Sequence, residues 1–168
     1  MSQTAITSPY VDYEFYTHVF YGDDISETEF NKFAARGEDL VDVITWNRIP
    51  DIPESLMTER LAIAIRKAVC AAAEQYKMLD LYTKGMLKSI EKAGKSGGVA
   101  SESNDGYAVS YQNVLSGGAG LSAASDAKAA YEREAKVVAL QYLADTGLLY
   151  RGAGNWHDRL RYATGEAS

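Results

Sequence analysis

The sequence predicts a mainly α-helical protein: a small helical bundle with one long central helix, a β-like loop insert and an extended C-terminal tail. Three stretches carry apolar residues three or four positions apart, which is the spacing of one helix face. The 168 residues include only three prolines, and alanine, a strong helix former, is abundant. We divide the chain into an N-terminal arm (1–10), a helical domain (11–152) and a tail (153–168).

The first element after the polar arm is dense in aromatic residues, and residues 11–21 fit either a short helix or a strand. A turn at Gly22 follows. Ser26 and Glu29 then fit a capping box, which predicts a helix from Glu27 to Trp46. This helix ends before Ile49, because the residue that precedes a proline disfavours helical backbone.

A long helix is expected over residues 54–92, where it would span about 50 Å. Gly85 is a candidate bend or end for it. Small residues at 68 and 71–73 allow another helix to approach closely. The face that we expect to be buried comprises Leu61, Ile65, Ala68, Val69, Ala72, Tyr76 and Leu79.

A Gly/Ser-rich insert over residues 95–123 separates the long helix from a last helix over 126–145. Within the insert, Tyr107, Val109 and Tyr111 alternate with small residues, as in a strand. The last helix places Tyr131, Ala135, Val138 and Tyr142 on one side, and Gly147 fits the left-handed residue that closes a helix. The core predicted from the three helices contains Phe30, Phe33, Leu40, Ile44, Leu61, Ile65, Val69 and Val138.

Charge and cysteine content narrow the function classes. The formal net charge is −6 and the pI is near 4.9, which argues against a broad nucleic-acid-binding surface and against a regulator that binds DNA through a basic helix. The single cysteine, Cys70, excludes an internal disulfide. No secretory signal and no membrane span is visible, so we expect a protein of a reduced intracellular compartment.

The sequence contains no complete catalytic or ligand-binding motif. We therefore expect no catalytic, metal-binding or cofactor-binding residues and no cofactor. Gly94-Lys95-Ser96 lacks the earlier glycine of a phosphate-binding loop. Glu14 and His18 can share a helix face, but further metal ligands are missing. Cys70 lies among alanines and is expected to be a small core side chain. Three acids, Asp51, Glu54 and Glu59, are typical of helix N-termini.

Twelve tyrosines against four phenylalanines favour surfaces that are apolar on one side and wet on the other, as in protein–protein contacts. Some of them, such as Tyr13, Tyr16, Tyr76 and Tyr131, also fit the edge of a core. The alternative function is a small intracellular α-helical enzyme or ligand-binding bundle, with a pocket among Tyr76, Tyr131 and Trp46.

Four segments, taken in order, resemble the head–tail connector (adaptor) family of long-tailed phages. They are residues 21–30 (YGDDISETEF) with 40–45 (LVDVIT), the Ala-rich 68–75 (AVCAAAEQ), 101–111 (SESNDGYAVSY) and 141–152 (QYLADTGLLYRG). The resemblance covers residues 21–152, and the tail that follows is a departure from it.

The resemblance implies a structural virion protein of the neck, made in the host cytoplasm. Its subunits would form a ring, usually twelvefold, below the portal protein. The ring would extend the DNA channel and carry the stopper or tail-completion protein. Double-stranded DNA would pass without specific binding, since an acidic lumen repels its backbone.

Two segments are candidates for partner contacts. The tail is rich in aromatic and basic residues typical of binding hot spots, with a disordered end as the alternative. The resemblance implies that the tail contacts the portal through Arg151, Trp156, Arg159, Arg161 and Tyr162. In the insert, Tyr107, Val109 and Tyr111 are expected to add a strand to a neighbouring subunit or to the stopper.

Overall fold

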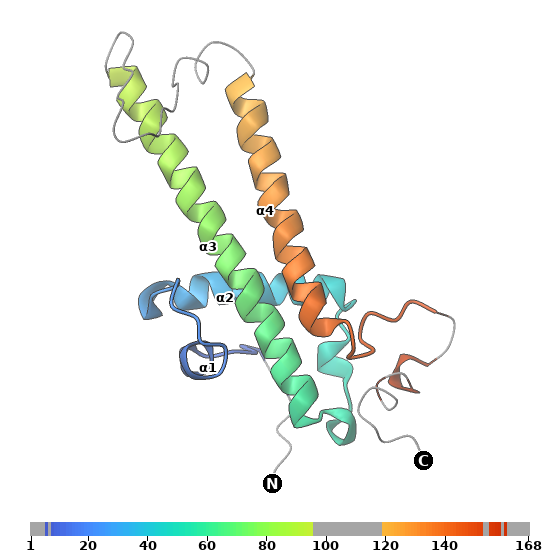
Figure 1. Ribbon diagram of the computed structural model, residues 1–168. Helices are drawn as coiled ribbons and strands as arrows, with labels where there is room; N and C mark the ends of the chain where they lie inside the picture. Colours follow the sequence, from blue (N-terminus) through green and yellow to red (C-terminus); the bar gives the residue numbers. More distant parts are fainter. Residues whose placement is uncertain (1–5, 7, 96–118, 153–154, 159, 161–168) are drawn as a thin grey trace. The chain divides into compact units, whose positions relative to one another are not determined.

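The computed structural model describes residue 6, residues 8–95, 119–152 and 155–158, and residue 160. Four α-helices and two 3₁₀ turns follow one another, residues 156–158 and 160 are also helical, and the described residues contain no strand (Figure 1). The elements are α1 (Tyr13–His18), α2 (Glu27–Ile44), η1 (Ile49–Asp51), η2 (Glu54–Leu56), α3 (Glu59–Lys95) and α4 (Ala119–Leu143). The predicted mainly α fold with one long helix is therefore confirmed.

The chain divides into two compact units. The first consists of residues 1–77 and 133–168, and the second of residues 78–132. In the second unit the ring of Tyr82, on α3, lies 5.9 Å from the ring of Tyr131, on α4. The core and the surfaces described below belong to the first unit.

The core of the first unit forms where α2 meets the small residues of α3. A Cβ on Gly37 would lie 2.5 Å from the backbone oxygen of Val69, so only glycine permits this approach. Phe30, Phe33 and Ile65 are fully buried beside the crossing. The expected close approach of another helix to the Ala-rich stretch of α3 is thus confirmed.

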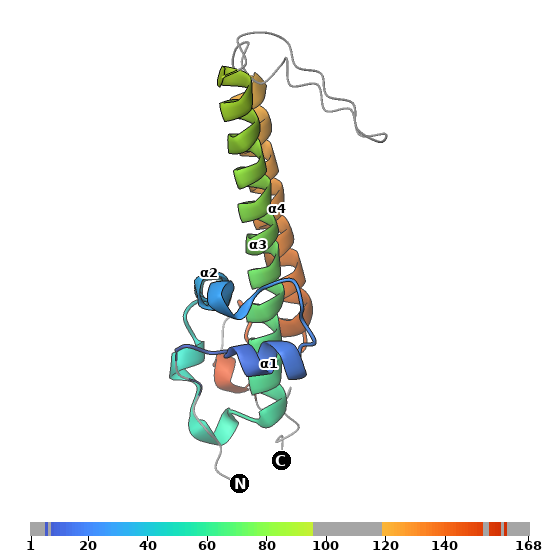
Figure 2. The ribbon, with the colours of Figure 1, turned by 90° about the vertical axis from the view of Figure 1, so that its left-hand side faces the viewer.

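Helix α1 packs its aromatic residues onto the same core and passes across the N-terminal half of α3 (Figure 2). Asp12 caps it, because its side chain accepts a hydrogen bond from the backbone N–H of Phe15 at 2.7 Å. Tyr16 is fully buried, and its ring lies 5.1 Å from the ring of Phe30. Residues 11–21 fitted either a short helix or a strand, and the structure has a short helix there, over Tyr13–His18.

Helix boundaries differ from the predictions by a few residues. Helix α2 ends at Ile44, and α3 begins at Glu59 after the short turn η2. Helix α3 continues through Gly85 to Lys95, and α4 begins at Ala119, inside the expected insert. Residues 96–118 of that insert, with Tyr107, Val109 and Tyr111, lie outside the described residues.

The buried face of α4 is also different. Ala135, Ala139 and Leu143 are fully buried at a spacing of four, whereas Val138 is half-buried and Tyr142 is 39% exposed. The larger side chains therefore lie beside the contact, and alanines let the helix approach. Leu40 is also only half-buried, although it packs against the core.

The N-terminal arm is more involved in the fold than its polar sequence suggests. Ile6 and Tyr10 are buried. The backbone N–H of Tyr10 donates to Oε2 of Glu38 at 3.2 Å, and its hydroxyl donates to Oδ1 of Asp42 at 2.8 Å. The arm that the sequence separates from the helical domain therefore packs against it at Ile6 and Tyr10.

Candidate interaction surface

The C-terminal end of α2 exposes apolar side chains. Val43 is 69% exposed and Trp46 is 52% exposed. Trp46 and Asn47 both have left-handed backbone, with φ of 63° and 52°. The N–H of Asn47 donates to the carbonyl of Asp42 at 2.8 Å, which closes the last turn. This tight cap turns the chain away from the helix and leaves the indole of Trp46 at the surface.

Arg48 ties the segment after α4 to this end of α2. Its guanidinium donates to the carbonyl oxygens of Leu148 at 3.1 Å and Tyr150 at 2.7 Å. Gly147, with φ of 79°, reverses the chain after α4, as predicted. Leu148 is fully buried. Residues 148–150 therefore have a fixed place beside α2.

Two arginines and two tryptophans alternate across this contact. The guanidinium of Arg151 lies 4.6 Å from the ring centroid of Trp46, and that of Arg48 lies 5.4 Å from the ring centroid of Trp156. Each arginine thus lies over an aromatic ring from the other segment, an arrangement stabilised by cation–π attraction. Arg151 remains exposed, while Trp156 packs partly against the core.

The structure therefore brings two of the predicted portal-binding residues, Arg151 and Trp156, to one place. Arg159, Arg161 and Tyr162 lie outside the described residues. Sequence reasoning missed Val43 and Arg48, and it assigned Trp46 only to a possible pocket. The available signal was the end of the apolar stripe, where Trp46, Asn47 and Arg48 follow Ile44 after one intervening residue.

A second surface precedes α2. Tyr21 is 82% exposed with φ of 61°, Val19 is 39% exposed, and Asp23 and Asp24 are exposed beside them. We call Val19, Tyr21, Asp23 and Asp24 the acidic loop. Twelve of the chain's 23 acidic residues and three of its 17 basic residues lie within residues 1–59, which makes this part of the chain strongly negative.

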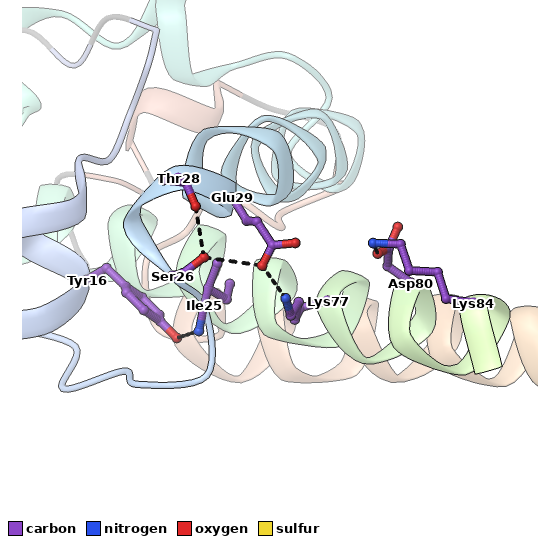
Figure 3. A network of polar contacts seen from close by, with 8 residues as sticks. All are labelled: Tyr16, Ile25, Ser26, Thr28, Glu29, Lys77, Asp80 and Lys84. Atoms are coloured by element: carbon purple, nitrogen blue, oxygen red, sulfur yellow. Dashed lines mark hydrogen bonds and ion pairs between the residues drawn. The ribbon is translucent and has the colours of Figure 1, made fainter.

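Both sides of the acidic loop are anchored on Tyr16. The N–H of Gly22 donates to the Tyr16 carbonyl at 2.9 Å, and a Cβ on Gly22 would collide with the Tyr16 ring. The N–H of Ile25 donates to the Tyr16 hydroxyl at 3.2 Å (Figure 3). That hydroxyl in turn donates to Glu74 at 3.1 Å. The loop is thus held in one conformation with Tyr21 outward.

The start of α2 adds a polar network beside this loop. Ser26 is the N-cap residue, but its hydroxyl donates to the Glu29 carboxylate instead of accepting a backbone N–H (Figure 3). Glu29 also pairs with Lys77 of α3. The predicted start of the helix is right, although the predicted capping box forms only this side-chain contact.

The residues considered for catalysis or metal binding have structural or surface positions. Burial raises the pKa of the Cys70 thiol to about 12, so this cysteine is a core side chain, as expected. His18 is exposed at the end of α1, and Nδ1 lies 3.1 Å from the carbonyl oxygen of Glu14. Asp51, Glu54 and Glu59 lie in the first turns of η1, η2 and α3. Within the described ranges, no group of three or more His, Cys, Asp or Glu side chains could hold a metal ion.

No family model, curated protein or solved structure matches the chain. The helices in the described part of the chain also lack the combination of length and apolar character that crossing a bilayer demands. The sequence resemblance and the two surfaces are therefore the grounds for proposing a function.

Proposed function

We propose that the chain is a head–tail connector (adaptor) subunit of a long-tailed phage. It is a structural virion protein that forms a ring, of about twelve copies by resemblance to the family, between the portal protein and the stopper. The ring extends the DNA channel through the neck of the virion.

The observation that carries this proposal is the anchoring of the C-terminal signature. Residues 141–152 carry the last segment of the resemblance, and Arg48 fixes two of their carbonyl groups at the end of α2. A free segment would lose much conformational entropy on binding a partner. Because this one is already attached, the residues that follow it start from a defined place on the subunit.

The composition of the surface supports a partner contact at that place. Tryptophan and arginine are the residues that most often dominate binding energy at protein interfaces. Here two of each meet where the tail begins. In the proposed function, residues beyond Gly152 contact the portal, with Trp156 as an apolar anchor and Arg159 and Arg161 as charge contacts.

Co-purification with the portal protein of the same phage tests this function. We expect the full chain to bind assembled portal and to add a ring of uniform mass. Arg159→Ala together with Arg161→Ala is expected to weaken binding, because two charge contacts are lost. Arg133→Ala with Lys136→Ala removes the same charge from exposed positions on α4 and serves as the control. A full chain that does not bind portal at low salt would contradict the proposal.

A further inference from the structure

Two exposed surfaces lie at opposite ends of α2. The acidic loop precedes its first turn. A second surface, the Trp46 patch, consists of Val43, Trp46 and Arg151 at its last turn. Helix α2 has 18 residues, which corresponds to about 27 Å between its ends. The two surfaces of one subunit are therefore too far apart to contact each other.

The two surfaces are complementary in chemistry. Each presents large apolar side chains to solvent: Val19 and Tyr21 on one, Val43 and Trp46 on the other. The acidic loop adds the carboxylates of Asp23 and Asp24, and the Trp46 patch adds the guanidinium of Arg151. Among the described residues, Arg151 has no carboxylate partner, and Asp23 and Asp24 have no cationic partner. Arginine–carboxylate pairs beside buried aromatic rings provide both affinity and orientation.

Both surfaces are also held in place before any contact forms. Tyr16 anchors the acidic loop on both sides of Tyr21. The tight cap of α2 and the guanidinium of Arg151 hold the indole of Trp46. Little backbone freedom of the acidic loop and of the α2 cap remains to be lost on association, which lowers the cost of forming an interface.

We propose that the acidic loop of one copy docks on the Trp46 patch of a second copy of this chain. Tyr21 packs against Trp46 and Val43, and Asp23 and Asp24 pair with Arg151. In the proposed arrangement each copy uses its acidic loop on one neighbour and its Trp46 patch on another, so the contact is head-to-tail and leaves one free surface on each end of a dimer. Such a contact propagates, and it closes into a ring when the rotation between copies allows closure.

This inference rests on the proposed function, since it assigns the contact between neighbours in the connector ring. It also gives Arg151 a different role from the one predicted by resemblance. In this arrangement Arg151 binds the next subunit, and the portal contact begins after Gly152.

The test uses two charge-reversed chains whose association is measured by sedimentation velocity at low salt over a concentration series. Arg151→Glu disables the Trp46 patch, and Asp23→Lys with Asp24→Lys disables the acidic loop. We expect the unchanged chain to associate, and each variant alone to associate at least about tenfold more weakly. In an equimolar mixture, the unchanged acidic loop of the first variant can pair with the unchanged Trp46 patch of the second, and the reversed charges on the other two surfaces attract each other. The mixture is therefore expected to recover association.

Matched controls have the same change in charge at exposed positions elsewhere. Arg133→Glu corresponds to the first variant, and Asp51→Lys with Glu54→Lys corresponds to the second. Both controls are expected to associate like the unchanged chain, and thermal unfolding checks that all variants fold. Tyr21→Ser is an independent variant that removes the apolar contact without changing charge, and it is expected to weaken association as well.

Three outcomes would overturn the assignment: an unchanged chain that stays monomeric throughout the series, variants that associate normally, or a mixture that associates no better than either variant alone. These outcomes are separate from the test of the proposed function. If the chain binds portal but associates through other residues, the proposed function stands and this interface is wrong. If the chain associates as described but never binds portal, the proposed function is wrong and the interface stands.

Discussion

At the scale of single residues, Phe33 gives the clearest test of how α2 is oriented. Its side chain is fully buried against α3, whereas Val43, ten positions later, is 69% exposed. We expect Phe33→Ala to reduce the free energy of unfolding by about 3–5 kcal/mol, the usual cost of a buried phenylalanine. Val43→Ala on the same helix is expected to change it little. Chemical unfolding of both variants measures the difference, and an unchanged midpoint for Phe33→Ala would mean that α2 faces the other way.

Two half-buried carboxyl groups, Asp42 and Glu74, predict how stability depends on pH. Burial raises the pKa of Asp42 above its ordinary value of 3.8, helped by the neighbouring charges of Glu38 and Asp39 and opposed by the hydrogen bond from Tyr10. Burial also raises the pKa of Glu74, helped by Asp24 and Asp23 and opposed by the hydrogen bond from Tyr16. The folded state therefore binds protons more tightly than the unfolded state, so stability falls as pH rises through the raised pKa values.

Replacing the carboxylate tests this dependence. The amide of Asp42→Asn can still accept the Tyr10 hydrogen bond but cannot ionise. Relative to the unchanged chain, we expect this variant to gain stability as pH rises from about 4 to neutral, while the two converge at lower pH. Urea unfolding at several pH values gives the comparison. A stability difference that does not vary with pH would show that Asp42 titrates alike in both states.

At the scale of elements, the crossing of α2 and α3 depends on one glycine. A Cβ at position 37 would meet backbone atoms of Val69 and Ala73, which cannot move aside as a side chain could. We expect Gly37→Ala to destabilise the fold by about 1–3 kcal/mol, despite the better helix propensity of alanine. Gly85→Ala is the control, since a Cβ there meets nothing within 4 Å, and it is expected to be neutral or to stabilise by up to about 1 kcal/mol. Thermal unfolding of both variants measures the two changes in stability, and an unchanged midpoint for Gly37→Ala would contradict the close crossing.

The helices could be predicted because each carries a local signal. The apolar stripe of α2 and the Ala-rich face of α3 identify their elements without knowledge of any partner. The buried face of α4 could not be predicted in the same way, because alanines at 135 and 139 are buried only once the neighbouring elements are in place. The N-terminal arm was missed for a similar reason. Its place depends on Tyr10 reaching Glu38 and Asp42, some 30 residues later in the chain.

The candidate site shows the same division between local and long-range signals. Composition alone indicated that Arg151 and Trp156 belong to a contact surface. Their partners Trp46 and Arg48 lie about 100 residues earlier, and no periodicity links the two segments. Residue types alone can thus suggest Arg151 and Trp156 as surface candidates, whereas Trp46 and Arg48 can be assigned to the same surface only from the fold.

At the scale of the whole molecule, the C-terminal tail belongs partly to the subunit and partly, in the proposed function, to the portal contact. Leu160 is fully buried in the core cluster, and Trp156 packs against it. The sequence suggested that the domain ends before residue 153, but the domain includes Trp156 and Leu160. A truncation that removes residues 153–168 removes part of the core together with the proposed portal contact.

Two truncations separate these roles. Removing residues 153–168 deletes Leu160 and Trp156, and we expect it to lower the free energy of unfolding by at least about 2 kcal/mol, the burial energy of one large apolar side chain. Removing only residues 161–168 keeps both side chains, so its stability should match that of the full chain, while the loss of Arg161 and Tyr162 should weaken portal binding. Thermal unfolding and portal co-purification of both chains provide the two measurements. If the longer truncation were as stable as the full chain, Leu160 would contribute nothing to the core; if the shorter one bound portal undiminished at moderate salt, the portal contact would have to lie before residue 161.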